Sequence, residues 1–455
     1  MDLNYIICKR CAGSKTSALQ WHRLKVITME WCEIYSLSIH FPAGRSAGIG
    51  EWGTYRRKEY SGMGQKRVTA NEFPNIQQAV EACAAEGGGI VTVPKGRWNS
   101  GPIHLYSNIH LQLEEGAVIS FSHKPEDYLP VVFTRWEGME CYNYSPLIYA
   151  KDCENISVTG AGTLLGNGQA WWHWKKLQQK AADKLCYAQS NGIPVEERIF
   201  GTEEAALRPS FIQAIHCKNV VFQGFTIMDG PQWTIHPVYC EDVIVRDVTV
   251  STHGPNTDGL NPDSCKGVLI EHCTFDTGDD CIAINSGMNE DGWRVNRPCE
   301  NIEIRDCVMT GGHGAVVIGS AVSGGVRNVY AHDCRIKNTM QGIRIKSMRG
   351  RGGYVENVTF SHMETEKISE QAVQINMFYE FSTVEPKADT PSRCRNISIQ
   401  DIHGSSLKTA IQIKGLPECK LQDITLENIN LKAPDAFECS NTETINIKNV
   451  TIINE

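Results

Sequence analysis

The chain has 455 residues, of which 41% are apolar and 21% charged, and its net charge at pH 7 is −8. This balance excludes a disordered or low-complexity chain and allows a large hydrophobic core. No run of about 18 apolar residues occurs, so no transmembrane helix is expected. The acidic net charge argues against a broad surface for nucleic acid or for anionic membranes, and we expect neither as a partner. Composition predicts no oligomeric state.

Residues 1–65 contain no internal repeat, and we assign them no fold. The first seven residues do not resemble a signal peptide, because no apolar core and no small-residue cleavage site follow them. A cytoplasmic location is therefore the default expectation. The 18 cysteines are expected to be reduced core residues. Cys8 and Cys11 have metal or redox spacing, but no second pair accompanies them, so we expect no metal there.

The first predicted element is a helix over residues 75–85, with Gly87–Gly89 as its end. We expect it to cap one end of the fold that follows. Its apolar residues have helical spacing: Ile76, Ala79, Val80 and Cys83.

A nine-residue pattern then recurs along the chain, with an anchor residue followed by alternating apolar positions, a bend and a second alternation. Each copy predicts two short strands that cannot bury their apolar faces alone. Stacking successive copies at about 4.8 Å solves this, so the repeat predicts a parallel β-solenoid over residues 66–455 rather than a propeller. A degenerate copy begins at Asn155, and the clear anchors are Asn219, Asp242, Gly267, Asn301, Asn328, Asn357, Asn396, Asp423 and Thr444.

The anchor asparagines at 155, 357 and 396 also form Asn-x-Ser/Thr strings. We expect these side chains to hydrogen-bond within a stack of turns rather than to carry glycans.

An insertion over residues 166–209 interrupts the repeat. It holds a helical run, KKLQQKAADKLCYAQ, which follows three tryptophans. The tryptophans fit either a local core or a wall on which sugars stack, and the insertion is placed near the cleft. They are Trp171, Trp172 and Trp174.

Four polar strings fall on consecutive copies of the repeat: NTDG at 256–259, GDDC at 278–281, GHG at 312–314 and RIK at 344–346. Counted from the anchors, they occupy nearly the same phase of each coil. In a solenoid, equal phase places side chains on one face. The segment 335–351 also holds six basic residues and no acidic one, which on an acidic protein indicates an anionic ligand.

Three carboxylates so close together cannot all ionise without cost, so at least one pKa must be raised. That arrangement suits acid/base cleavage of a glycosidic bond, which needs a proton donor and a base for water. Arg344 and Lys346 lie one period-2 step apart, so both point to the same side and can hold a carboxylate. A uronic acid polymer satisfies both halves of such a site.

NTDG, GDDC, GHG and RIK, in that order, resemble the signature of the polygalacturonases, glycoside hydrolase family 28. The resemblance implies a right-handed parallel β-helix and metal-independent, cofactor-free, inverting hydrolysis of α-1,4-linked galacturonic acid in pectin. It implies Asp279 as general acid and Asp258 and Asp280 as the residues that hold the attacking water. His313 would support protonation of the acid.

The same resemblance implies that Arg344 and Lys346 bind the substrate carboxylate. Asn256 and Tyr379 would contact substrate as well. Residues 232–240 and 349–358 resemble the bacterial, exo-acting branch of the family. Exo action needs one closed end of the groove, which the insertion around Trp171–Gln189 could provide.

Alternatives remain open at this point: a rhamnogalacturonan or xylogalacturonan hydrolase, a calcium-dependent β-helical pectate lyase, and a non-catalytic polysaccharide-binding β-helix. Inverting enzymes typically hold their two carboxyl groups about 6.5–9.5 Å apart. Neighbouring coils supply only about 5 Å, so the position along the strand would have to supply the rest.

Overall fold

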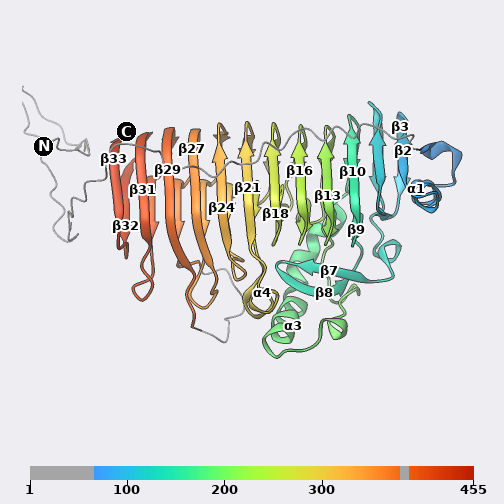
Figure 1. The fold of residues 1–455 in the computed structure, drawn as a ribbon, viewed down its shortest axis with the longest axis horizontal. Helices are drawn as coiled ribbons and strands as arrows, with labels where there is room; N and C mark the ends of the chain where they lie inside the picture. The colour runs from blue at the N-terminus through green and yellow to red at the C-terminus, as the bar shows by residue number, and fades with distance from the viewer. Residues whose placement is uncertain (1–65, 380–388, 455) are drawn as a thin grey trace, which may run out of the picture. The chain divides into compact units, whose positions relative to one another are not determined.

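The computed structural model describes residues 66–379 and 389–454 and forms a right-handed parallel β-helix, as predicted (Figure 1). The expectations for residues 1–65, including those for Cys8 and Cys11, lie outside the described residues. Among those described, no helix has the length and hydropathy needed to cross a bilayer.

Each coil contributes strands to three parallel faces. The first face stacks β1 (Lys66–Thr69), β2 (Gly89–Val93), β5 (Ile109–Leu113), β10 (Glu154–Gly160), β13 (Lys218–Gln223), β16 (Glu241–Arg246), β18 (Lys266–Glu271), β21 (Cys299–Arg305), β24 (Val326–His332), β27 (Tyr354–Ile368), β29 (Arg393–Ser406), β31 (Gln422–Lys432) and β33 (Ile445–Ile453). The second face stacks β3 (Gly96–Ser100), β6 (Ala117–Phe121), β11 (Thr163–Leu165), β14 (Thr226–Met228), β17 (Thr249–Thr252), β19 (Thr274–Thr277), β22 (Val308–Gly311) and β25 (Arg335–Lys337).

The third face carries the polar strings. Its two sheets are joined through bridges at Leu260, which pairs with Ile235 on one side and Ile282 on the other. The strands of this face are β4 (Ile103–His104), β9 (Ile148–Lys151), β12 (Ile212–Ile215), β15 (Ile235–Val238), β20 (Ile282–Ile284), β23 (Gly314–Ile318), β26 (Gln341–Lys346), β28 (Gln371–Asn376), β30 (Thr409–Lys414) and β32 (Asp435–Ser440).

The predicted register is confirmed, because each anchor of the repeat stands beside the next across the first face. Strand pairing aligns Lys218 with Glu241, for example, and so aligns the anchors one residue later. Anchors have backbone φ near +55°, as in Asn219 and Asp242, a conformation that Asn, Asp and Gly accept most readily. The expected side-chain ladder forms as well, since Asn219 donates to Asn155 at 3.0 Å and Asn396 donates to Asn357 at 2.7 Å.

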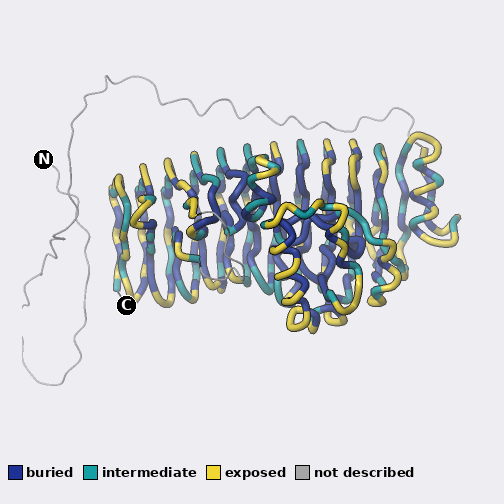
Figure 2. Tube along the Cα trace, turned by 90° about the horizontal axis from the view of Figure 1, so that it is seen from below, coloured by how far each residue is buried: buried dark blue, intermediate teal, exposed yellow. Residues whose placement is uncertain are grey.

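Apolar columns fill the interior of the coil, which is dark blue in Figure 2. Burying each such side chain contributes roughly 1.5–3 kcal/mol. One column consists of Val220, Val243, Val268, Ile302, Val329, Val358, Ile397 and Ile424, each at most 2% exposed. Another consists of the thiols two residues before the anchors: Cys153, Cys217, Cys240, Cys265 and Cys299. All described cysteines are free of disulfides, as expected for reduced core residues.

The predicted capping helix is α1 (Ile76–Ala85). Asn75 is its N-cap residue, because the Asn75 side chain accepts a hydrogen bond from the backbone amide of Gln78. Its apolar side packs against the first coil. A 3₁₀ turn, η1 (Ala70–Glu72), precedes it.

A second group of elements packs beside the third face and is called the cap here. It consists of the hairpin β7 (Val132–Trp136) and β8 (Met139–Asn143), the insertion 166–209, and α4 (Asn289–Val295) (Figure 1). The insertion folds into α2 (Gln169–Trp172), η3 (His173–Lys176), α3 (Gln179–Ser190) and η4 (Val195–Glu197), and η2 (Pro125–Tyr128) precedes the hairpin. Helix α3 contacts both β8 and α4.

Buried ion pairs hold the cap together and attach it to the β-helix. Arg135 of the hairpin contacts Asp263 of the third face at 3.0 Å, and both side chains are fully buried. Arg198 of the insertion contacts Asp291 of α4 at 2.7 Å. Because losing one partner of such a pair costs about 3–5 kcal/mol, these contacts fix the cap where the sequence interrupts the repeat.

Candidate active site

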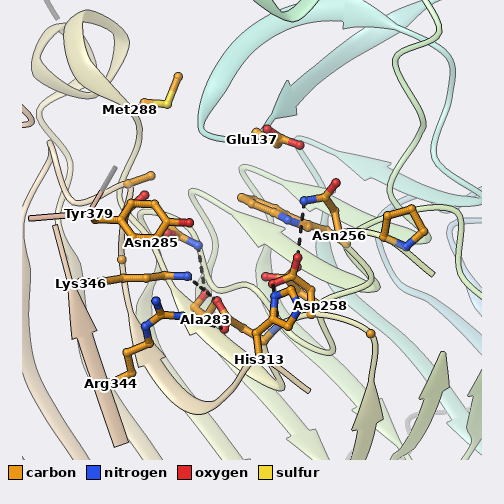
Figure 3. Close-up of a pocket in the computed structure, with 18 of the residues that line it drawn as sticks. Glu137, Asn256, Asp258, Ala283, Asn285, Met288, His313, Arg344, Lys346 and Tyr379 are labelled. Carbon is orange, nitrogen blue, oxygen red and sulfur yellow. Dashed lines mark hydrogen bonds and ion pairs between the residues drawn. The ribbon is translucent and has the colours of Figure 1, made fainter. Parts of the chain in front are cut away.

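A cavity of about 810 Å³ lies where the third face meets the cap. All eight residues expected at the site line it: Asn256, Asp258, Asp279, Asp280, His313, Arg344, Lys346 and Tyr379. The sequence analysis therefore placed them together correctly, although they span more than 120 positions of the chain (Figure 3).

The stacking register explains this convergence. The bridge between Leu260 and Ile282 aligns Asp258 with Asp280 on neighbouring coils. The pairing of β20 with β23 aligns Asp279 with His313. The basic residues are offset, because Arg344 lies four positions beyond the residue that aligns with His313. The acidic groups and the histidine thus occupy two adjacent positions of the coil, and the long basic side chains reach back to them.

The three carboxyl groups form a tight cluster, with one oxygen of each within 4.8 Å of the others. The additional separation expected from strand position is not present, so inversion continues to rest on the family resemblance rather than on carboxyl spacing. Burial and the charges of Asp279 and Asp280 raise the pKa of Asp258 well above its usual range. The predicted raised carboxyl pKa is therefore found at Asp258, which also accepts a hydrogen bond from Asn261 at 2.8 Å.

The negative charge of Asp280 is compensated by the ammonium group of Lys346. The Lys346 Nζ donates to Asp280 Oδ2 at 2.7 Å, and both side chains are less than 10% exposed. Burial disfavours the ammonium, but the Asp280 carboxylate overcomes this and raises the pKa of Lys346. Arg344 Nη1 lies 4.0 Å from Asp280, and its Nε donates to Gln374 at 2.9 Å.

Asp279 is compensated by His313, whose Nδ1 lies 3.0 Å from Asp279 Oδ1. This contact raises the pKa of His313 although partial burial opposes the shift. Burial opposes ionisation of Asp279, but His313 and Lys346 outweigh it and lower the pKa of Asp279. In the resting site the proton of this pair therefore stays on His313.

Aromatic and amide groups complete the predicted set. The Arg344 and Lys346 cations lie 5.7 and 5.1 Å from the ring centre of Tyr379. The Asn256 amide donates to Asp279 Oδ2 at 3.5 Å.

The sequence analysis missed Arg208, which controls the orientation of Asn256. Its guanidinium is fully buried and donates to the Asn256 oxygen at 2.9 Å, which turns the Asn256 amide nitrogen toward Asp279. It also donates to the backbone oxygens of Pro231 and Pro255 and to Gln178. Burial lowers the pKa of Arg208 to about 10. No sequence signal marked it, because it lies at the end of an insertion outside the repeat.

The cap contributes further cavity residues that the sequence analysis missed, among them Trp136, Glu137 and Lys175, and Trp233, just before β15, lines the cavity as well. The three tryptophans of the insertion, Trp171, Trp172 and Trp174, lie outside the cavity lining. Trp171 and Trp174 are buried in the core with Tyr144, and Trp172 donates to the Gly230 oxygen. The local-core interpretation is confirmed for Trp171 and Trp174, whereas Trp172 is only partly buried, and none of the three lines the cavity.

The cluster of three carboxylates is the one group of side chains among the described residues with spacing suited to a metal ion. Lys346 and His313 already contact two of its members at 2.7 and 3.0 Å. A cation bound there would have to displace both basic side chains or share their carboxylates, which Coulomb repulsion disfavours.

Comparison with known proteins agrees with the motifs. The model of "Glycosyl hydrolases family 28" matches residues 198–452. An exopolygalacturonase structure from Thermotoga maritima is 38% identical, with a TM-score of 0.81, over 86% of this chain and 92% of that one.

Two curated relatives are more distant. A probable polygalacturonase from Vitis vinifera is 28% identical over 82% of this chain and 73% of its own length. An exo-poly-alpha-D-galacturonosidase from Dickeya chrysanthemi is 26% identical over 75% of this chain and 61% of its own length. The chain belongs to glycoside hydrolase family 28, the polygalacturonase family.

Proposed function

We propose that this family 28 enzyme hydrolyses α-1,4-galacturonosyl linkages of galacturonan and releases residues from a chain end. The observation that carries the proposal is the carboxylate cluster beside Arg344 and Lys346, in a cavity whose other side is formed by the cap. A galacturonate chain fits this arrangement for two reasons. The carboxylates of the enzyme can cleave its glycosidic bond, and the cations of the enzyme can bind the acid groups of the sugar.

In this proposal Asp279 protonates the glycosidic oxygen, and the bond between that oxygen and C1 breaks. Asp258 and Asp280 hold the water that attacks C1, and Asp280, which is paired with Lys346, accepts its proton. Asp280 Oδ1 supports this role, since it is buried and accepts no hydrogen bond from any described residue. It is therefore available to a water molecule.

Asp279 must first gain a proton, and His313 is its source. The two groups lie 3.0 Å apart, so the proton can cross one hydrogen bond. An anionic sugar in the cavity excludes water and adds negative charge, both of which favour the neutral Asp279 over the carboxylate. Substrate binding thus converts a resting ion pair into a proton donor.

The cap supports action at a chain end. Trp136 and Glu137 from the hairpin and Lys175 from the insertion line the cavity, and Glu137 lies across it from the basic residues (Figure 3). A polymer can then extend in one direction only. The sequence analysis expected the insertion to close one end of the groove. We extend this proposal, so that the insertion and the hairpin close it together.

Product sizing tests the proposal. Polygalacturonate and trigalacturonate are incubated with the enzyme, and we expect monogalacturonate from the first time points. Early mixed oligomers would contradict chain-end action. Products that absorb near 235 nm, together with loss of activity in chelator, would instead indicate a calcium-dependent lyase. An Asp279→Asn protein should bind oligogalacturonate without cleaving it, and wild-type inactivity on every pectic polymer would favour a binding module.

A further inference from the structure

The tip of the β7–β8 hairpin places an acidic side chain in the cavity. Glu137 lines the cavity together with Lys175 and Trp233. Figure 3 shows it on the side of Asn256, across the cavity from Arg344 and Lys346. Neither the family motifs nor the carboxylate cluster accounts for this residue.

The backbone of Glu137 indicates that the tip is specialised. Glu137 and Gly138 have φ of +45° and +85°, the pattern of a two-residue hairpin turn that favours Asn, Asp or Gly at both positions. A glutamate there costs free energy, and such costs concentrate at functional sites. A Cβ added to Gly138 would lie 3.0 Å from the Met288 nitrogen, so the tip is packed tightly against the neighbouring loop.

The side chain of Glu137 is also held in place. Gln232, only 2% exposed, donates to Glu137 Oε1 at 3.3 Å and accepts from Trp136 Nε1 at 3.1 Å. Burial raises the pKa of Glu137, although the nearby Lys175 and Arg208 oppose the shift. A fixed carboxyl group of this kind is preorganised to bind a ligand group.

The chemistry of the ligand group follows from charge. A carboxyl beside an acidic cluster repels the acid group of a galacturonate but binds hydroxyl groups well. In the residue at the non-reducing end, the C4 hydroxyl lies across the ring from C1, so it faces away from the catalytic carboxylates. Within the chain, the C4 oxygen is part of a linkage and has no proton to donate.

We propose that Glu137 is a specificity-determining residue that binds the C4 hydroxyl of the non-reducing terminal galacturonate, while Lys175 faces the carboxylate of that residue. The inference rests on the proposed chain-end hydrolysis. It also places the enzyme in a reaction sequence. Oligomers made by β-elimination end in a 4,5-unsaturated residue without this hydroxyl, so the substrate must come from hydrolytic cleavage.

The test compares kcat/KM for trigalacturonate with a saturated or a 4,5-unsaturated non-reducing end. A site built around a substrate hydroxyl rejects an analogue without it, so the wild type should prefer the saturated trimer by about 100-fold or more. Glu137→Gln and Glu137→Ala should lose at least about 10-fold on the saturated trimer and less than about threefold on the unsaturated one. Glu196→Gln, an exposed residue of the cap, is the matched control and should change neither rate.

Lys175→Ala should raise KM more than it lowers kcat, whereas Lys176→Ala, an exposed neighbour outside the cavity lining, should behave as wild type. Equal wild-type rates on the two trimers, or equal losses on both in the Glu137 variants, would overturn the inference. If product sizing still gives only monomer in that case, chain-end hydrolysis stands and the role of Glu137 alone is wrong. Mixed oligomers from the wild type would refute the proposed function itself.

Discussion

Replacing Lys346 by Met should destabilise the protein as well as inactivate it. The Lys346 ammonium is 2.7 Å from Asp280 and is less than 10% exposed, so it neutralises a carboxylate that has little contact with bulk water. Methionine keeps most of the volume but removes the charge. Asp280 is then left buried beside Asp258 and Asp279, with only the more distant Arg344, at 4.0 Å, as a cation, because His313 is paired with Asp279.

The size of the effect can be worked out. Removing one partner of a buried ion pair costs about 3–5 kcal/mol. Unfolding entropy is about 2.1 cal/mol/K per residue, or about 0.8 kcal/mol/K for the roughly 380 residues of the described β-helix. The melting temperature should therefore fall by about 4–6 °C. Thermal unfolding followed by circular dichroism at fixed protein concentration measures it.

A matched control uses the exposed pair of Lys337 and Glu366, which are 2.8 Å apart and 44% and 47% exposed. Lys337→Met should leave the melting temperature within about 1 °C of the wild type, because water screens this pair. The double variant Lys346→Met/Asp280→Asn should recover at least about half of the loss, since the uncompensated buried charge is gone. If Lys346→Met melts as wild type, or the second substitution recovers nothing, Lys346 does not serve as the counter-ion of Asp280.

Two further predictions concern the proton donor and the support of Asn256. The wild type needs the proton of the His313–Asp279 pair, so its activity should fall as pH rises through the raised pKa of His313. In His313→Gln that proton must reside on a carboxyl group, which loses it at lower pH, so the basic limb of the kcat/KM profile should move to lower pH; an unmoved limb would contradict the role of His313. Arg208→Lys should keep a buried positive charge but lose the geometry of several hydrogen bonds, so kcat should fall about 10-fold or more with little change in KM. A larger effect on KM than on kcat would show that Arg208 acts through binding instead.

The β-helix could be predicted because the same short pattern of anchor and apolar residues recurs in coil after coil. Most coils place a residue with φ near +55° at the anchor, and Asn or Asp supplies it in the same register in all but two of the clear copies, those at Gly267 and Thr444. Alternating apolar residues then follow at fixed offsets from the anchor. Counting from the anchors was therefore enough to align Asp279 with His313. Asp258 and Asp280 lie 16 and 13 positions beyond their anchors, so their alignment follows from the bridge between Leu260 and Ile282 and not from the count.

The cap could not be predicted in the same way. Its contacts join segments with no shared period, such as Arg135 with Asp263 and Arg198 with Asp291. The three tryptophans of the insertion look like a sugar-binding surface in sequence, because large aromatic residues serve both purposes. In the structure Trp171 and Trp174 pack as core, and the tryptophans that line the cavity are Trp136 and Trp233, which stand alone in sequence.

The charges of the site indicate different roles for the two basic residues in RIK, Arg344 and Lys346. With the proton on Asp258, the two remaining carboxylates are balanced by Lys346 and by the protonated His313. Arg344 is then the cation that the cluster does not need for its own neutrality. It lies farther from Asp280, at 4.0 Å, and beside Tyr379 at the cavity wall. The sequence analysis gave both residues one role, but we propose that Arg344 mainly binds the sugar carboxylate and that Lys346 mainly serves the internal charge balance.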